Sequence, residues 1–146
     1  MSLVKPYTQG FSLMEALITL VVLSVGLLGV SAMVTNSVRF TDTAEMRSQS
    51  VMLAYDIADK MRANSDNTID YTIDIGANVA NSPDCSTNSC SGEDLADADL
   101  ANWKARLANN LPAGDGSTVI NADAASITIQ WSDRGQLRTF NMVTAL

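Results

Sequence analysis

The sequence predicts an α+β fold in which one long N-terminal helix packs on a small antiparallel sheet, with one extra short helix. Three observations lead to this expectation. An apolar segment near the N-terminus continues into an amphipathic one, leucines recur at helical spacing further on, and the C-terminal third alternates apolar and polar residues between turns. A helix with one apolar stripe and a sheet with one apolar face bury both by packing together.

The long helix is expected to have two halves of different character. Ala16–Val38 contains no charged residue, and about 23 residues at 1.5 Å each extend roughly 34 Å, enough to cross the apolar layer of a membrane. Beyond it, apolar residues recur at three- and four-residue spacing, which predicts one buried face up to about Asn64. The expected divisions are residues 1–10 before the helix, a membrane-spanning half at 11–38, an amphipathic half at 39–64 and a globular head at 65–146.

The polar side of the second half is expected to face solvent. Asp56 and Lys60 lie four residues apart on this side, so we expect them to form an ion pair on the helix surface.

The head is expected to contain the second helix and the sheet. Ile69–Ile75 alternates apolar residues and indicates a short extended segment. Asp94–Leu111 predicts the second helix, in which Trp103 is expected to anchor the core or an interface. The strands are expected at Ser117–Asn121, Ile127–Trp131 and Leu137–Val143, the last two joined by a turn that places Gly135 in a left-handed conformation.

Composition excludes several classes of function. The net charge is -7 and the nine Lys and Arg residues are scattered, whereas nucleic-acid binding requires clustered basic residues. Histidine, the usual side chain for proton transfer near neutral pH, is absent, and no serine has a placed base. We therefore expect no nucleic-acid partner, no cofactor, no metal site and no catalytic residues, and hence no enzyme.

Asp66, Asp70 and Asp74 recur every fourth position, without the glycine-centred pattern of a calcium loop. Solubility is their expected role.

The two cysteines, Cys85 and Cys90, are expected to form a local disulfide. A zinc site needs four ligands, and thiol redox enzymes use two cysteines separated by two residues. A disulfide is the simplest interpretation if the head lies outside the cytoplasm, and chain entropy gives so short a loop about 2 kcal/mol of stabilisation.

The N-terminus allows three interpretations. Lys5 is the only charge in residues 1–10 and, by the positive-inside rule, keeps this end cytoplasmic while the chain after Val38 crosses the membrane. A secretory signal peptide would have a shorter apolar region followed by a cleavage site. An ordinary anchor explains the span, and explains Glu15 by nearby headgroups and the helix dipole. The third interpretation starts from the order Gly10, Phe11, Glu15.

Residues 10–30, GFSLMEALITLVVLSVGLLGV, resemble the class III leader and N-terminal segment of type IV pilins and pseudopilins. The resemblance implies cleavage between Gly10 and Phe11 by a prepilin peptidase, which makes residues 1–10 a removed leader, and methylation of the new amino group on Phe11. The apolar helix is kept, first as an anchor and later as filament core. The resemblance also implies that Glu15 pairs with the Phe11 amine of a neighbouring subunit; an unpaired buried charge is costly, so this pair would set the axial register.

The segments LANWKARLANNLPAG and SITIQWSD, at residues 100–114 and 126–133, resemble PilV-type minor pilins. Positions 11–64 contain no proline, whereas major pilins of similar N-terminal sequence often carry a helix-kinking one. The resemblance implies a minor pilin that primes pilus assembly with other minor pilins, the major pilin and an inner-membrane assembly platform, supporting adhesion or twitching motility. Its implied location is the inner membrane with a periplasmic head, and then the pilus.

Two alternatives stay open from the sequence. One is a pseudopilin of a type II secretion or competence system, and the other is a membrane-anchored binding module of the cell envelope outside any filament.

Overall fold

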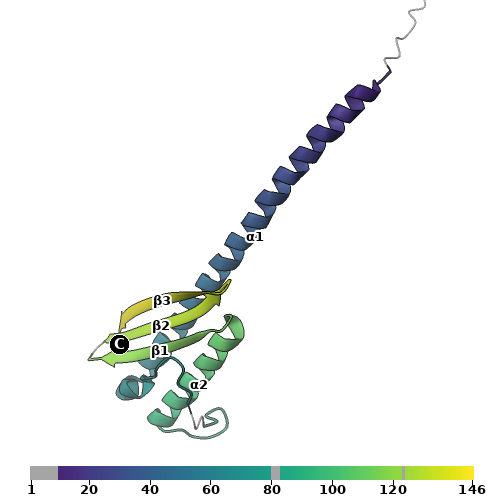
Figure 1. The fold of residues 1–146 in the computed structure, drawn as a ribbon. Coiled ribbons are helices and arrows are strands. Elements are labelled where there is room, and N and C mark those ends of the chain that lie inside the picture. Colours follow the sequence, from purple (N-terminus) through teal and green to yellow (C-terminus); the bar gives the residue numbers. More distant parts are fainter. Residues whose placement is uncertain (1–9, 80–82, 123) are drawn as a thin grey trace, which may run out of the picture. The chain divides into compact units, whose positions relative to one another are not determined.

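A computed structural model describes residues 10–79, 83–122 and 124–146. It confirms the predicted α+β fold (Figure 1). The elements are helix α1 Leu13–Ala63, the 3-10 helix η1 Ser65–Tyr71, helix α2 Gly92–Asn110, and strands β1 Asp115–Asn121, β2 Ala124–Asp133 and β3 Gln136–Ala145.

The chain forms two compact units, the first ending at Thr41 and the second covering Asp42–Leu146. The described part of the first unit is the apolar N-terminal portion of α1, whose large side chains are exposed. Four of its hydroxyl groups donate to the carbonyl oxygen four residues earlier, at 2.6–3.0 Å: Thr19, Ser24, Ser31 and Thr35. These polar groups are satisfied within the helix, as an apolar surrounding requires.

The second unit contains an antiparallel sheet in the order β1-β2-β3. Alternate residues of β2 are buried, from Ala125 through Ile127, Ile129 and Trp131 to Asp133. The inward alternation predicted for Ile127, Ile129 and Trp131 is therefore confirmed. Each is opposite a β3 residue on the same face of the sheet, with Trp131 paired to Arg138.

The turn between β2 and β3 has the geometry that suits a two-residue hairpin. Arg134 and Gly135 both have positive φ, 52° and 78°. Two successive left-handed residues match the right-handed twist of the strands. The left-handed Gly135 was expected; the left-handed Arg134 was not, because a basic residue has no special preference for this conformation.

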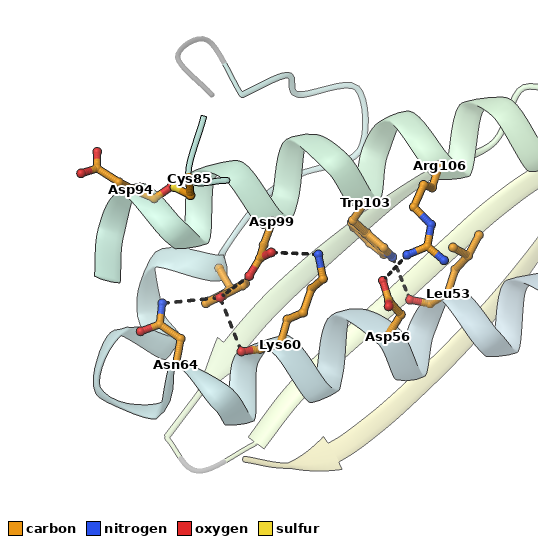
Figure 2. A network of polar contacts seen from close by, with 10 residues as sticks. Leu53, Asp56, Lys60, Asn64, Cys85, Asp94, Asp99, Trp103 and Arg106 are labelled. Atoms are coloured by element: carbon orange, nitrogen blue, oxygen red, sulfur yellow. Dashed lines mark hydrogen bonds and ion pairs between the residues drawn. The ribbon is translucent and has the colours of Figure 1, made fainter. Parts of the chain in front are cut away.

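The core of the head is shared by α1, α2 and the sheet. From α1 it includes Leu53, Ala54, Ile57, Ala58 and Met61. Trp103 of α2 is fully buried, as predicted, and its indole Nε1–H donates to the Leu53 carbonyl oxygen at 2.9 Å (Figure 2). The largest fully buried side chain thus satisfies its one polar group on the neighbouring helix.

The predicted Asp56–Lys60 ion pair is wrong. Asp56 instead pairs with Arg106 at 2.6 Å, and Lys60 pairs with Asp99 at 2.8 Å (Figure 2). Both partners lie on α2. A sequence pattern on one helix cannot reveal that a second helix supplies better-placed charges.

Ile69–Ile75 does not form the extended segment that its alternation indicated. Ser65–Tyr71 is a 3-10 helix, and only Ile73 forms an isolated bridge, to Thr118. Ile69 is 65% exposed, so the alternation does not mark a buried face. One side-chain hydrogen bond here is local, from Asn67 to Asn64 at 3.0 Å. The other is tertiary: Asn64 donates to the Gly92 carbonyl oxygen, at the start of α2, at 2.7 Å.

Tyr71 joins η1 to both helices. It is fully buried, and its hydroxyl donates to Asp99 Oδ2 at 2.9 Å. Burial raises the pKa of Tyr71 to about 12, helped by Asp99 and opposed by a hydrogen bond from Asn64. The neutral phenol is therefore a permanent donor to Asp99 near neutral pH.

A second polar contact ties α2 to β1. Lys104 Nζ lies 2.6 Å from Asp115 Oδ1, and both side chains are largely buried. Although burial acts to raise the pKa of Asp115, hydrogen bonds from Lys104, Gly76 and Gly116 hold this pKa below its usual value. The carboxylate therefore favours the folded state when it is ionised.

Gly116→Ala is expected to destabilise the head by about 1–3 kcal/mol, the usual cost of overfilling a packed core. A Cβ at Gly116 would lie 2.5 Å from Trp103 Cη2 and 3.0 Å from the Thr128 carbonyl oxygen. Chemical denaturation of the full chain in detergent measures the change. Val119→Ala, on the exposed side of the same strand, is the control and should cost less than about 1 kcal/mol. Equal stability of Gly116→Ala and the wild type would contradict this packing.

Asp115→Asn is expected to lower stability near neutral pH by about 2 kcal/mol, because Lys104 loses a charged hydrogen-bond partner. A lowered folded-state pKa gives stability that is present above the unfolded pKa and lost as pH falls through the folded one. The difference from wild type should therefore shrink below about pH 4. Denaturation curves across this range test the sign. Asp66→Asn, which removes the charge of an exposed carboxylate, is the control and should lower stability by less than about 0.5 kcal/mol.

Candidate functional site

The predicted site begins where α1 begins. Leu13 is the first helical residue, and the Ser12 carbonyl oxygen accepts from the backbone N–H of Glu15 at 3.0 Å and of Ala16 at 3.1 Å. The Ser12 hydroxyl also accepts from the Met14 N–H at 3.3 Å. Ser12 therefore caps the helix by satisfying N–H groups that have no partner within it.

Gly10 and Phe11 lie outside the helix, directly before this cap. Phe11 is 81% exposed, and nothing lies within 4 Å of a Cβ built on Gly10. A peptide bond without helical hydrogen bonds is more accessible to a peptidase than one inside a helix. The geometry is compatible with cleavage between Gly10 and Phe11, and this cleavage stays a prediction. Lys5 lies outside the described residues.

Glu15 lies in the first turn of α1 and is exposed. A carboxylate here interacts favourably with the positive end of the helix dipole. Within the described residues it forms no ion pair, and its backbone carbonyl oxygen accepts from the Thr19 hydroxyl at 2.6 Å. Phe11 and Glu15 are thus brought to one end of the helix, and the role of Glu15 in assembly stays a prediction.

The disulfide between Cys85 and Cys90 is present, with a Cα–Cα distance of 5.5 Å. Its loop ends directly before Ser91, the N-cap of α2. Ser91 and Asp94 form a capping box in which each side chain accepts from the other's backbone N–H. Hydrogen bonds from Ser91 hold the pKa of Asp94 below its usual value. The disulfide therefore closes a short loop directly before the capped start of α2.

Among the described residues, no group of three or more His, Cys, Asp or Glu side chains is arranged to hold a metal ion.

Sequence reasoning missed two parts of this arrangement. Ser12 and Glu15 have the Ser-x-x-Glu spacing of a capping box, so a search for helix starts would have found the cap. The network of Lys60, Asp99 and Tyr71 has no comparable signal, because Lys60 and Tyr71 precede Asp99 by 39 and 28 residues in the chain.

The membrane-spanning property of α1 is supported by composition. Of the described residues, α1 is the one helix that is long and apolar enough to cross a membrane, with a mean hydropathy of 2.5 in its most apolar window, none of it buried.

Comparison with family models gives two matches. Residues 5–31 match the prokaryotic N-terminal methylation motif, and residues 32–101 match the family described as type IV pilin Tt1218. Neither curated proteins nor solved structures give a match.

The two matches are contiguous, and the first covers Gly10, Phe11 and Glu15. With the α+β head and an N-terminal helix that fits a membrane anchor, they lead to one conclusion: the chain belongs to the type IV pilins.

Proposed function

We propose that this protein is a minor pilin of a type IV pilus, with a structural rather than a catalytic role. In this proposal a prepilin peptidase cleaves between Gly10 and Phe11, and the Phe11 amine is methylated. The subunit waits in the inner membrane with its head in the periplasm. It then joins other minor pilins and the major pilin at the inner-membrane assembly platform, priming a pilus that serves adhesion or twitching motility.

The observation that carries the proposal is the arrangement at the start of α1. The Gly10–Phe11 peptide bond lies outside α1, Ser12 caps the start of α1, and Glu15 is in the first turn of α1. Cleavage would therefore place a new ammonium group next to the helix start without removing any helical residue. The anchor survives processing intact, as a subunit that moves from membrane to filament requires.

Glu15 would then have a specific partner. In a bundle of apolar helices a carboxylate without a cation is costly, and the Phe11 ammonium of an adjacent subunit lies at the corresponding end of its helix. Such an ion pair can form only when two neighbouring helices are shifted by one particular distance along the filament axis. The pair would therefore select the axial register of the subunits, while apolar side chains supply most of the contact area between the helices.

The minor role is supported by two features. The segments at residues 100–114 and 126–133 resemble PilV-type minor pilins. In addition, α1 continues from Leu13 to Ala63 without the proline that often kinks the corresponding helix of major pilins.

The first prediction concerns processing. The N-terminal peptide of the mature protein is expected to begin with methylated Phe11, and mass spectrometry of cells with an active prepilin peptidase checks this. Deleting the peptidase should leave the leader in place and serves as the control. An uncleaved N-terminus in the presence of the active peptidase would favour an envelope module outside any filament.

The second prediction concerns assembly. Glu15→Leu and Glu15→Ala should leave membrane insertion unchanged but lower the amount of the subunit in sheared pili by at least about tenfold, the effect of losing roughly 1.4 kcal/mol per subunit contact. Immunoblots of membranes and sheared pili measure both quantities. Glu45→Ala, an exposed carboxylate on the same helix beyond the apolar segment, is the matched control. Wild-type amounts of the Glu15 variants in pili would refute the role of this carboxylate.

A further inference from the structure

The head has a basic pocket at the end that carries the β2–β3 turn. It has a volume of about 350 Å³ and is lined by Thr43, Arg47, Trp131, Arg138, Thr139 and Phe140. Trp131 and Arg138 are directly opposite each other on β2 and β3, and Thr43 and Arg47 lie one turn apart on α1. The two walls therefore come from different elements and each contributes an arginine.

The residues that line this pocket include two arginines and no carboxylate. Asp133 is buried and is shared by two cations, with its carboxylate 3.3 Å from Arg134 Nε and 3.7 Å from Arg138 Nε. Arg47 is exposed, and its guanidinium has no hydrogen bond or ion pair within the described part of the chain. The lining therefore presents two guanidinium groups, of which that of Arg138 has an ion pair among the described residues and that of Arg47 has none. Glu45 points to the other side of α1, about 200° around the helix from Thr43.

The other basic residues of the head are used internally. Lys60, Arg62, Lys104 and Arg106 each form an ion pair with an aspartate at 2.6–2.9 Å. The pocket is therefore where an otherwise acidic head presents cationic groups to its surroundings. Trp131 adds a buried indole N–H that has no acceptor among the described residues. An anionic group bearing several acceptor oxygens would match this set of donors.

The chain itself limits how far this end of the head is from the membrane. Thr43 lies five residues after Val38, the last residue of the uncharged segment, so the two Cα atoms are within about 18 Å for any orientation of the head. The Thr43 hydroxyl donates to Asp133 Oδ2 at 3.3 Å and accepts from Arg134 at 2.8 Å. The β2–β3 turn is thereby held close to Thr43, within reach of a headgroup layer about 5–8 Å thick.

We propose that this pocket docks the head on the membrane by binding the phosphate groups of anionic phospholipids in the leaflet that α1 leaves. Arg47 and Arg138 contact the phosphate oxygens. Leu137, 68% exposed beside the turn, enters the interface. Arginine and tryptophan are typical of such interfaces. Docking would hold the unassembled subunit in one orientation and would end when it leaves the bilayer.

An acidic protein surface is the competing occupant of such a pocket. Lipid is favoured because the tether places the pocket near headgroups whenever the chain is anchored, without any second protein. Each arginine near an anionic surface strengthens the interaction by roughly fivefold, the equivalent of about 1 kcal/mol. The effective concentration of headgroups seen by a tethered head is also high.

The test uses the full chain in nanodiscs made of phosphatidylcholine alone or mixed with phosphatidylglycerol. A nitroxide label is attached at Leu137→Cys or, as the matched control, at Val143→Cys, which is 73% exposed on the same strand. The Cys85–Cys90 disulfide stays closed and unlabelled. Accessibility of the label to lipid-soluble and water-soluble relaxation agents reports whether that position contacts lipid.

The Leu137 label is expected to contact lipid in the anionic discs, less so in the neutral ones and at high salt, while the Val143 label stays in water in both. Arg47→Gln and Arg138→Gln should each shift the docking equilibrium roughly fivefold toward the undocked state. Arg62→Gln removes the same charge near the far end of β3, where Arg62 contacts Thr144 and Ala145, and should have no effect. Unchanged thermal unfolding shows that each variant is folded.

Two results would overturn the proposal. One is a Leu137 label with the same aqueous accessibility in both kinds of disc. The other is a loss of pilus incorporation in Arg47→Gln with an unchanged Leu137 signal, which would assign the pocket to an acidic protein partner. Neither result bears on processing at Gly10, so the proposed minor-pilin function is tested separately.

Discussion

The contact between α1 and α2 at Trp103 is the interaction on which the head depends. Trp103 is fully buried and its indole N–H is bonded to the Leu53 carbonyl oxygen, so its position relative to α1 is fixed by both packing and a directional hydrogen bond. Trp103 also lies against Gly116 on β1, where only a residue without a side chain leaves room for the ring. One side chain thus sets how closely α2 approaches both α1 and the sheet.

The polar groups around this core reinforce the same contact. Arg106–Asp56 and Lys60–Asp99 link α2 to α1 on either side of Trp103 (Figure 2). Tyr71 of η1 also donates to Asp99. Exposed ion pairs alone contribute little, but Asp99 is largely buried and also accepts from Tyr71, so its charge must be satisfied in place. The network selects one alignment of the helices while apolar burial supplies most of the stability.

The single helix α1 serves two environments by a change of composition at Val38. Before it, hydroxyl groups bond within the helix and large apolar side chains are exposed, which suits lipid or other apolar helices. After it, one face is buried in the head. Two of its charges lie at distinct places: Glu15 is in the first turn, and Arg47, nine residues after Val38, lines the basic pocket of the head.

The sequence by itself determined the elements whose signals are local. The uncharged segment, the motif at Gly10, Phe11 and Glu15, the left-handed Gly135 and the inward residues of β2 each depend on periodicity or on a few adjacent residues. The disulfide was also predictable, since its cysteines are only five positions apart. Tertiary structure alone decided which charges pair, because Asp56 and Lys60 find partners about forty to fifty residues away. It likewise turned Ser65–Tyr71 into a 3-10 helix and placed Arg47 beside Arg138: such contacts depend on the packing of distant segments, and no local pattern encodes them.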